Sequence, residues 1–226
     1  MQAVEKGGAV VGVKGDDAVV LAVERRDVPE LQDPRTLRKV VTLDKHIALA
    51  FAGLNADARV LVDMARVEAQ SHRLTLEDAP TVEYMARHIA KLQQQYTQRG
   101  GRRPFGLSTL LAGFDADGSP RLWSTDPSGI HTGWSANAIG RSYKSLREYL
   151  EAHYKAGLKQ QEAVKLALST LLEVVTASAA GVEVLVATAE GHSKLEGADL
   201  EALIKEIEAE KAEAEEGAAG AAASST

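Results

Sequence analysis

Residues 5–26 read EKGGAVVGVKGDDAVVLAVERR, and this stretch decides the fold. Two valine-rich runs, Ala9–Val13 and Ala18–Val23, flank the residues Gly15-Asp16-Asp17. β-Branched residues favour strands, and Gly and Asp supply the backbone conformations that a tight turn needs. The stretch therefore predicts a β-hairpin, which starts just after two glycines and ends in Glu24-Arg25-Arg26.

The composition of the chain is that of a globular domain. It has 226 residues, of which 45% are hydrophobic and 26% charged, enough to bury a substantial core. A net charge of −6 gives no support for binding to nucleic acid, and the absence of cysteine excludes disulfides, thiolate catalysis and zinc–sulfur sites. No signal peptide opens the sequence and no apolar run approaches the ~18 residues of a membrane span, so we expect an intracellular protein with no membrane partner.

Beyond the hairpin, strands and helices alternate in groups. A polar, proline-containing stretch, Asp27–Arg38, is predicted to be an excursion of the chain over the surface, outside any sheet. Further strands are predicted at His46–Ala52, Leu107–Phe114, Arg121–Ser124, Val182–Thr188 and Ser193–Leu195, and helices from Leu54 to Ala69 with Asn55 as N-cap, from Thr75 to about Tyr96, at Ser142–Tyr154, at Lys159–Val175 and around Leu200–Ile207.

The order of these elements favours one fold class. Helices come in pairs and do not follow each strand singly, which argues against a doubly wound parallel sheet. Two antiparallel β-sheets packed face to face, each covered outside by a helix pair, would bury both faces of every strand. We therefore expect an α/β four-layer sandwich over residues 9–211, followed by a disordered acidic tail rich in Ala, Gly and Ser over residues 212–226.

Several strings in this order resemble the proteasome subunit family, specifically its ring-forming alpha-type branch. They are GGAVVGVKG, AFAGLNADARVLVDMARVEAQSHRL, QYTQRGGRRPFGLSTLLAGFD, TDPSG and NAIGR, and the resemblance covers the chain from about Ala3 to about Lys211. LQDPRTLRK and QSHRLTLED are most similar to the eukaryotic subunit at the fourth position of the alpha ring. The resemblance implies the four-layer fold of N-terminal nucleophile hydrolases.

The resemblance also gives a meaning to the glycines before the first strand. In catalytic beta-type relatives, processing exposes an N-terminal threonine whose hydroxyl attacks the peptide carbonyl. Alignment places Gly8 at that threonine, Glu24 and Lys39 at its carboxylate and lysine partners, Arg141 at a serine and Val175 at a second aspartate. Because glycine has no hydroxyl, the resemblance implies a non-catalytic structural subunit. The alternative, an active threonine-type peptidase subunit, would require processing to a Thr, Ser or Cys.

The resemblance also implies a second set of residues, which would bind the tail of a partner protein. In alpha-type subunits, a lysine at the place of Lys39 pairs with the terminal carboxylate of an activator's C-terminal tail, in a pocket between neighbouring subunits. Gly53 and Leu54 would line the same pocket, and Gly7 the pocket of the adjoining subunit. The alternative for Lys39 is an ordinary solvated lysine at a strand start. Gly53 and Leu54 mark a strand end and a helix start in either case.

Arg102 and Arg103 precede Pro104 in the alpha-type string. They are candidates for contacts with a ring neighbour through paired hydrogen bonds to a carboxylate. The alternative is a basic loop that the following proline keeps extended. His72 and His88 lack the spacing of metal ligands, so no metal site and no cofactor is predicted.

The resemblance further implies partners and place. The partners are neighbouring alpha-type subunits, beta-type subunits and the C-terminal tails of regulatory particles, in the cytoplasm and nucleus. A free-standing homo-oligomeric ring is a further possibility. Alpha-type subunits carry an N-terminal gate segment, of which residues 1–8 match only the last part, so we expect no gate residues from the sequence given.

Overall fold

The computed structural model describes residues 2–25, 31, 38–175 and 181–223, with side-chain surroundings as far as Lys211. The helices are α1 (Gln2–Glu5), α2 (Asn55–Leu76), α3 (Val82–Gln98), α4 (Tyr143–His153), α5 (Gln160–Leu171) and α6 (Ala198–Ala223). The strands are β1 (Val10–Lys14), β2 (Val19–Glu24), β3 (Val40–Asp44), β4 (Ile47–Gly53), β5 (Leu107–Phe114), β6 (Pro120–Thr125), β7 (His131–Gly133), β8 (Ala136–Ile139), β9 (Val182–Thr188) and β10 (Gly191–Leu195).

The strands form two antiparallel five-stranded sheets. One has the order β10-β9-β2-β1-β8 and the other β3-β4-β5-β6-β7. The predicted hairpin is confirmed: β1 pairs with β2 from Val10↔Val23 to Lys14↔Val19, and Gly15 N donates to Ala18 O across the turn (2.8 Å). This hairpin therefore forms the middle of the first sheet.

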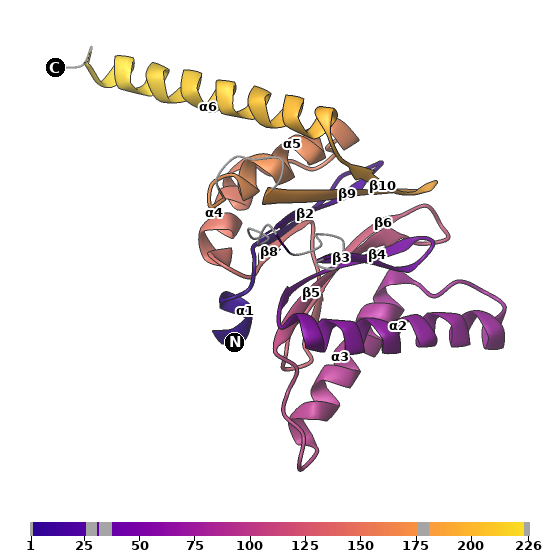
Figure 1. The fold of residues 1–226 in the computed structure, drawn as a ribbon. Helices are drawn as coiled ribbons and strands as arrows, with labels where there is room; N and C mark the ends of the chain where they lie inside the picture. The colour runs from indigo at the N-terminus through magenta and orange to yellow at the C-terminus, as the bar shows by residue number, and fades with distance from the viewer. Residues whose placement is uncertain (1, 26–30, 32–37, 176–180, 224–226) are drawn as a thin grey trace.

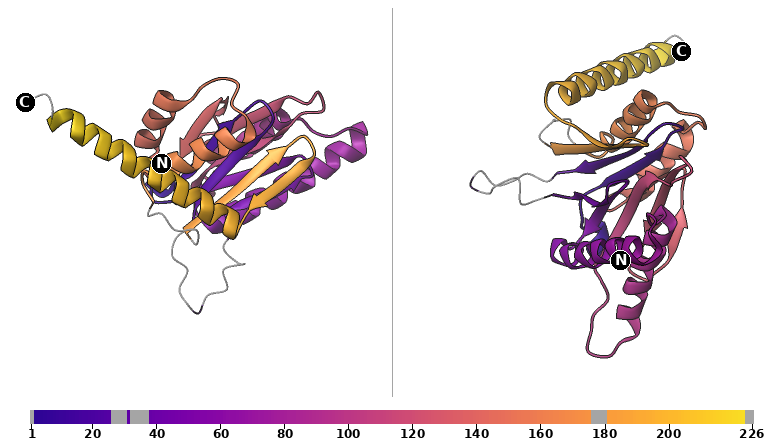
Figure 2. Two further views of the ribbon diagram at one scale, coloured as in Figure 1. Left: turned by 90° about the horizontal axis from the view of Figure 1, so that it is seen from above. Right: turned by 90° about the vertical axis from the view of Figure 1, so that its right-hand side faces the viewer.

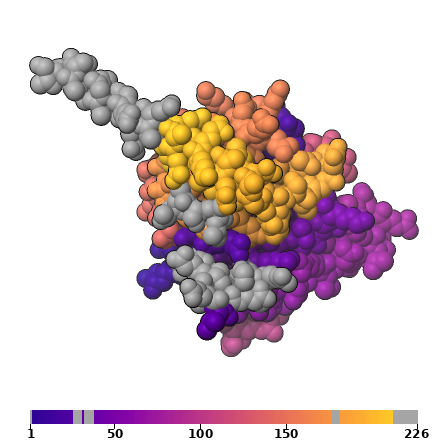
Figure 3. All heavy atoms as spheres, turned by 45° about the horizontal axis from the view of Figure 1, so that its top comes forward, coloured from indigo at the N-terminus to yellow at the C-terminus, as the bar shows by residue number. Residues whose placement is uncertain are grey.

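Helices cover the outer face of each sheet, which confirms the predicted four-layer sandwich. α2 and α3 pack on the second sheet, and α4 and α5 on the first (Figures 1 and 2). α6, drawn in yellow, lies beside the α4–α5 layer (Figures 1 and 3). Its Leu200, Ile204 and Ile207 belong to the same apolar cluster as the buried residues of α4 and α5. Buried side chains thus form three successive clusters, one under each helical layer and one between the sheets.

The continuous apolar runs of the central strands follow from this layering. Along β2, Val20 and Ala22 face the helices, whereas Val19, Leu21 and Val23 face the opposite sheet. Successive side chains of a strand point to opposite faces, so a strand buried on both sides needs apolar residues at every position. The sequence of the hairpin therefore fixes its place inside the sandwich.

The structure corrects the predicted start of the second helix. α2 continues through Thr75, whose hydroxyl donates to Ser71 O within the helix (2.8 Å), and ends at Leu76, before Glu77 with its left-handed backbone (φ 57°). The true N-cap of α3 is Thr81, whose side chain accepts from Tyr84 N (3.1 Å). A threonine hydroxyl can cap the start of a helix or donate to a carbonyl inside a helix. The capping pattern alone therefore predicts the wrong residue here.

Other boundaries differ more modestly. The residue before α2 is Leu54 and makes no side-chain cap, so the prediction of Asn55 as N-cap is wrong. α5 ends at Leu171, short of Val175. β3, β7 and β8 were not predicted as strands; β7 and β8 are short and lack a clear apolar alternation.

The end of the chain also differs from expectation. The helical backbone of α6 runs to Ala223, well into the segment 212–226 for which disorder is expected, in keeping with the high helix propensity of Ala and Glu. Most of the predicted excursion Asp27–Arg38 lies outside the described residues. Within the described part of the chain, no helix is both long and apolar enough to cross a membrane.

Candidate functional site

The first candidate site surrounds Gly8, which lies between α1 and β1. Antiparallel pairing of β1 with β2 brings Glu24 beside it: Glu24 N donates to Ala9 O (2.8 Å), and Ala9 N donates to Glu24 Oε2 (2.7 Å). The Glu24 side chain is only 9% exposed. The hairpin thus places a buried carboxylate directly next to Gly8, the residue predicted to align with the catalytic threonine.

Lys39, just before β3, extends into the same site. Its Nζ donates to Glu24 O (3.1 Å). A Cβ built on Gly8 would overlap this Nζ and would lie 3.1 Å from Glu24 O. The lysine ammonium therefore stands in the space from which any side chain at position 8 would have to start.

Arg141 completes the group from the far end of β8. One of its Nη atoms donates to Glu24 Oε1 (2.8 Å) and to Val174 O (3.3 Å), next to Val175. The preceding residue, Gly140, has φ +88°, and a Cβ there would overlap Gly8 O. The structure therefore brings together Gly8, Glu24, Lys39 and Arg141, four of the residues that the resemblance singles out.

This arrangement has the surroundings of a nucleophile but no nucleophile. Residue 8 has neither hydroxyl nor thiol, and residues 1–7 precede it, so its nitrogen is an amide and not a free amine. Both carboxylate oxygens of Glu24 already accept hydrogen bonds, from Ala9 N and from Arg141. As the structure stands, residue 8 cannot attack a peptide carbonyl, and its charged neighbours stabilise the fold around it.

The residues proposed to bind activator tails lie close to this group. Gly7 is buried against the strand end, where a Cβ would lie 2.5 Å from Gly53 N. Gly53 has φ +132°, a conformation that L side chains rarely adopt, and Leu54 is 44% exposed. Phe51 N donates to Lys39 O (3.4 Å), so Lys39 starts beside the same end of β4. The contact between Gly7 and Gly53 lies within one chain, and a contact of Gly7 with an adjoining subunit stays a prediction.

Arg102 and Arg103 have partners within the chain. Both Nη atoms of Arg103 donate to the carboxylate of Asp57 (2.6 Å each), in the paired geometry expected for a neighbour's carboxylate. Gly106 N donates to the same carboxylate (2.9 Å), and the Arg102 guanidinium lies 4.9 Å from the centre of the Tyr96 ring. A contact of either arginine with a ring neighbour stays a prediction.

Asp57 is a residue that the sequence reasoning missed. The hydrogen bonds from Arg103 hold the pKa of the Asp57 carboxyl below its usual value, against the opposing effect of burial. Its position in the first turn of α2 is the signal that could have drawn attention to it, since carboxylates are favoured there. With Arg103 it ties the loop after α3 to the start of α2.

His72 and His88, the two histidines considered as metal ligands, have ordinary roles. His72 Nδ1 lies 3.1 Å from Asp78 O, and His88 Nδ1 lies 3.6 Å from Glu68, with burial lowering the pKa of His88. In the portion of the chain that the structure describes, no group of three or more His, Asp or Glu side chains is placed to hold a metal ion.

Comparison with known proteins identifies the family of the chain. The profile of the family described as proteasome subunit matches residues 4–188. Proteasome subunit alpha type-7 of Solanum lycopersicum is 59% identical over 217 residues, covering 95% of this chain and 83% of that protein. Proteasome subunit alpha type-7-B of Arabidopsis thaliana is 58% identical (95% and 87% covered), and alpha type-8 of Mus musculus is 52% identical (95% and 87% covered).

These relatives decide between the two predicted functions. Alpha-type subunits are the non-catalytic members of a threonine-protease complex, so the prediction that this chain is a structural alpha-ring subunit and not an active peptidase is confirmed. That Gly8 stands in for the catalytic threonine stays a prediction. Because the family profile spans most of the chain and these relatives are more than half identical over nearly all of it, the chain belongs to the proteasome subunit family, among its alpha-type members.

Proposed function

We propose that this subunit occupies the fourth position of the alpha ring, with Gly8 in place of the catalytic threonine, and that it helps to assemble the ring and to admit substrates to the core particle. The observation that carries the proposal is the 52–59% identity to alpha-type subunits over nearly the whole chain, together with a residue at position 8 that has no side chain. The Lys39 ammonium lies in the space beside Gly8 from which the side chain of a nucleophile would have to start.

The intact mass and N-terminal sequence of the mature chain test this proposal. A chain that still carries residues before Gly8 supports it, since a peptidase subunit would need processing to a nucleophile. A mature chain that begins at a Thr or Ser would contradict it. Chemical crosslinking in the purified complex, read by mass spectrometry, identifies the two ring neighbours and so tests the fourth position.

We further propose that Lys39, Gly53 and Leu54 receive the C-terminal tail of a regulatory particle. Leu54 is 44% exposed, and Lys39 is half-buried at the same strand end, where its ammonium can approach a carboxylate. To do so, the ammonium must leave Glu24 O, at a cost of about 1 kcal/mol for the hydrogen bond, which the new charge pair would offset.

A labelled tail peptide titrated against the assembled ring tests this site. Replacing the terminal carboxylate by an amide, or Lys39 by Ala, should weaken binding about tenfold. Lys45→Ala, on the exposed turn of the same β3–β4 hairpin, is the matched control and should leave affinity unchanged. Equal affinity of the acid and amide peptides would contradict the proposed pairing.

The proposed partners are neighbouring alpha-type subunits, beta-type subunits and regulatory particles, in the cytoplasm and nucleus. Native mass spectrometry of material purified from cells distinguishes a large hetero-complex from a free-standing ring of one chain, and imaging of a tagged chain tests the location. For Arg102 and Arg103, charge reversal of Arg102 should lower the yield of assembled ring if it contacts a neighbour. An unchanged yield would limit Arg102 to its contact with Tyr96 within the chain.

A further inference from the structure

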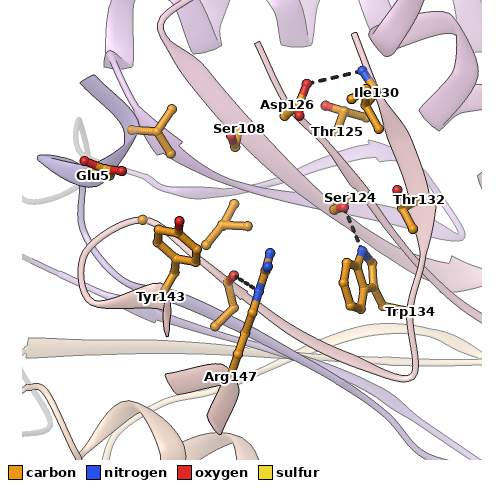
Figure 4. A pocket seen from close by; sticks show the side chains of 14 residues that line it. Glu5, Ser108, Ser124, Thr125, Asp126, Ile130, Thr132, Trp134, Tyr143 and Arg147 are labelled. Atoms are coloured by element: carbon orange, nitrogen blue, oxygen red, sulfur yellow. Dashed lines mark hydrogen bonds between the residues drawn. The ribbon is translucent and has the colours of Figure 1, made fainter. Parts of the chain in front are cut away.

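A cavity of about 240 Å³ borders the charged group around Gly8, since Gly140 lies on its wall and also contacts Gly8. Its walls come from α1, the ends of β5 and β6, the β7–β8 segment and the first turns of α4 (Figure 4). Val4, Trp134 and Ile139 supply apolar surface, and Ser108, Ser124 and Thr132 supply hydroxyl groups. The cavity is smaller than the pockets that hold drug-sized ligands, and its volume suits a small polar group on a short apolar body.

Arg147 is the cation of this cavity, and its guanidinium is fixed in place. Nε donates to Asn137 Oδ1 (2.7 Å) and to Ala138 O (3.2 Å). Its central carbon lies 5.1 Å from the Trp134 ring centre and 5.2 Å from the Tyr143 ring centre. In Figure 4 the end of the guanidinium points into the cavity between these two rings.

The two Nη atoms of Arg147 are the unused donors of the site. Among the residues that the structure describes, none accepts a hydrogen bond from these atoms, and no carboxylate lies within ion-pair distance of them. Burial lowers the pKa of Arg147, which reflects the cost of keeping a charge in this place. A half-buried, pre-oriented pair of donors is the arrangement that binds a planar oxyanion through two parallel hydrogen bonds.

The acidic residues on the wall limit the charge that the cavity accepts. Asp126 is engaged in its own turn, since Oδ1 accepts from Ser128 N (2.9 Å) and Ile130 N (3.2 Å). Glu5 is exposed at the rim on α1. Glu151, on α4, adds a third carboxylate, whose charge acts on Arg147. With these acidic groups around the cavity, a doubly charged phosphate would be repelled more strongly than a singly charged carboxylate, which also matches the guanidinium in shape.

We propose that this cavity binds a carboxylate, held by the two Nη atoms of Arg147, with its hydrocarbon part against Val4, Trp134 and Ile139. The carboxylate comes either from a small free organic acid or from an acidic side chain of a protein. This binding site is separate from the proposed tail site, and neither needs the other.

Tryptophan fluorescence of the full-length chain tests the proposal. The chain has two tryptophans, so Trp123→Phe leaves Trp134, on the cavity wall, as the only reporter. Sodium butanoate should change the Trp134 emission in a saturable manner, and the uncharged analogue butanamide should not. Arg147→Gln should raise the dissociation constant for butanoate about tenfold or more, and Arg147→Lys should recover part of the loss, because it keeps the charge without the planar fork.

A second arm separates the two sources of the carboxylate. A blocked tripeptide Ala-Glu-Ala, compared with Ala-Gln-Ala, presents an acidic side chain without free ends. Response to this peptide but not to butanoate identifies a protein side chain as the occupant, and response to butanoate identifies a free acid. Inorganic phosphate should bind more weakly than either.

Controls keep the result interpretable. Arg87→Gln, on the exposed face of α3 and paired with Glu83, removes a guanidinium outside the cavity and should leave the titrations unchanged. Urea unfolding of the Arg147 variants verifies that they fold. The proposal is overturned if butanoate and both peptides give no saturable change, if the neutral analogues act like the acids, or if folded Arg147→Gln binds as tightly as the parent chain.

Discussion

Substitution of Gly8 by Ala tests whether Lys39 really fills the space of a side chain at this position. The added Cβ would overlap Lys39 Nζ, so the lysine must swing away and give up its hydrogen bond to Glu24 O. The same Cβ would lie 3.1 Å from Glu24 O, a contact that the backbone must relieve by a few tenths of an ångström. The two effects are separable, because only the first depends on the lysine.

The expected cost follows from these contacts. A displaced, half-buried ammonium loses a hydrogen bond worth about 1 kcal/mol, and the tight backbone contact adds several tenths more. Gly8→Ala should therefore lower the free energy of unfolding by about 1–2 kcal/mol. In a Lys39→Ala background the first term is already gone, so the same change should cost about 1 kcal/mol less. The entropy that alanine removes from the unfolded chain is the same in both backgrounds and cancels.

Urea unfolding of the four chains of this double-mutant cycle measures the coupling. The matched control is Gly100→Ala, because nothing lies within 4 Å of a Cβ placed there, and its effect should add to that of Lys39→Ala. If the effects of Gly8→Ala and Lys39→Ala also add to within about 0.5 kcal/mol, the lysine does not occupy the space beside Gly8 and the reasoning is wrong.

Three further changes have defined outcomes. Gly8→Thr should give no peptidase activity in the full chain, because the new hydroxyl lacks the free amine of a processed N-terminus; hydrolysis of a fluorogenic peptide by the purified chain is the measurement. Thr81→Ala should cost about 1 kcal/mol in urea unfolding, since it removes the cap of α3. Because the pKa of Asp57 is lowered in the folded chain, its pairing with Arg103 stabilises the fold at pH values above the ordinary carboxyl pKa. This stabilisation is lost as the pH falls through the lowered pKa. Arg103→Gln should therefore reduce the urea midpoint at pH 7, and the difference from the parent chain should be smaller at pH 3. An equal difference at both pH values would show that the pair acts through packing alone.

Much of the fold was predictable from local patterns, and the errors have a common cause. The strands over residues 107–114 and 182–188 were placed at their observed ends, because their apolar runs are bounded by Gly, Asp and Glu. The helix start at Thr75 was wrong because a hydroxyl that caps one helix can bond within another. Short edge strands such as β7 were not predicted, because β7 is a strand through its pairing with β6 and not through the pattern of its own side chains.

The candidate site, too, was predictable only in part. The absence of a nucleophile at position 8 is a property of the residue itself, and the hairpin pattern is enough to place Glu24 beside it. The pairing of Arg103 with Asp57 was not predictable. The two residues lie 46 positions apart, and the carboxylate that binds Arg103 could have come from a neighbouring subunit or from this chain. The cavity around Arg147 gave no sequence signal at all.

The sequence alone thus determined which strands are buried on both faces and that residue 8 offers no hydroxyl, since both follow from side-chain chemistry at fixed spacing. Only the tertiary structure decided which charges meet. Arg141 neutralises Glu24 across 117 residues of chain and Lys39 turns towards Gly8, while no residue that the structure describes accepts from the two Nη atoms of Arg147. The physical reason is that charge pairing depends on distances of a few ångströms, which are set by the packing of layers and not by separation along the chain.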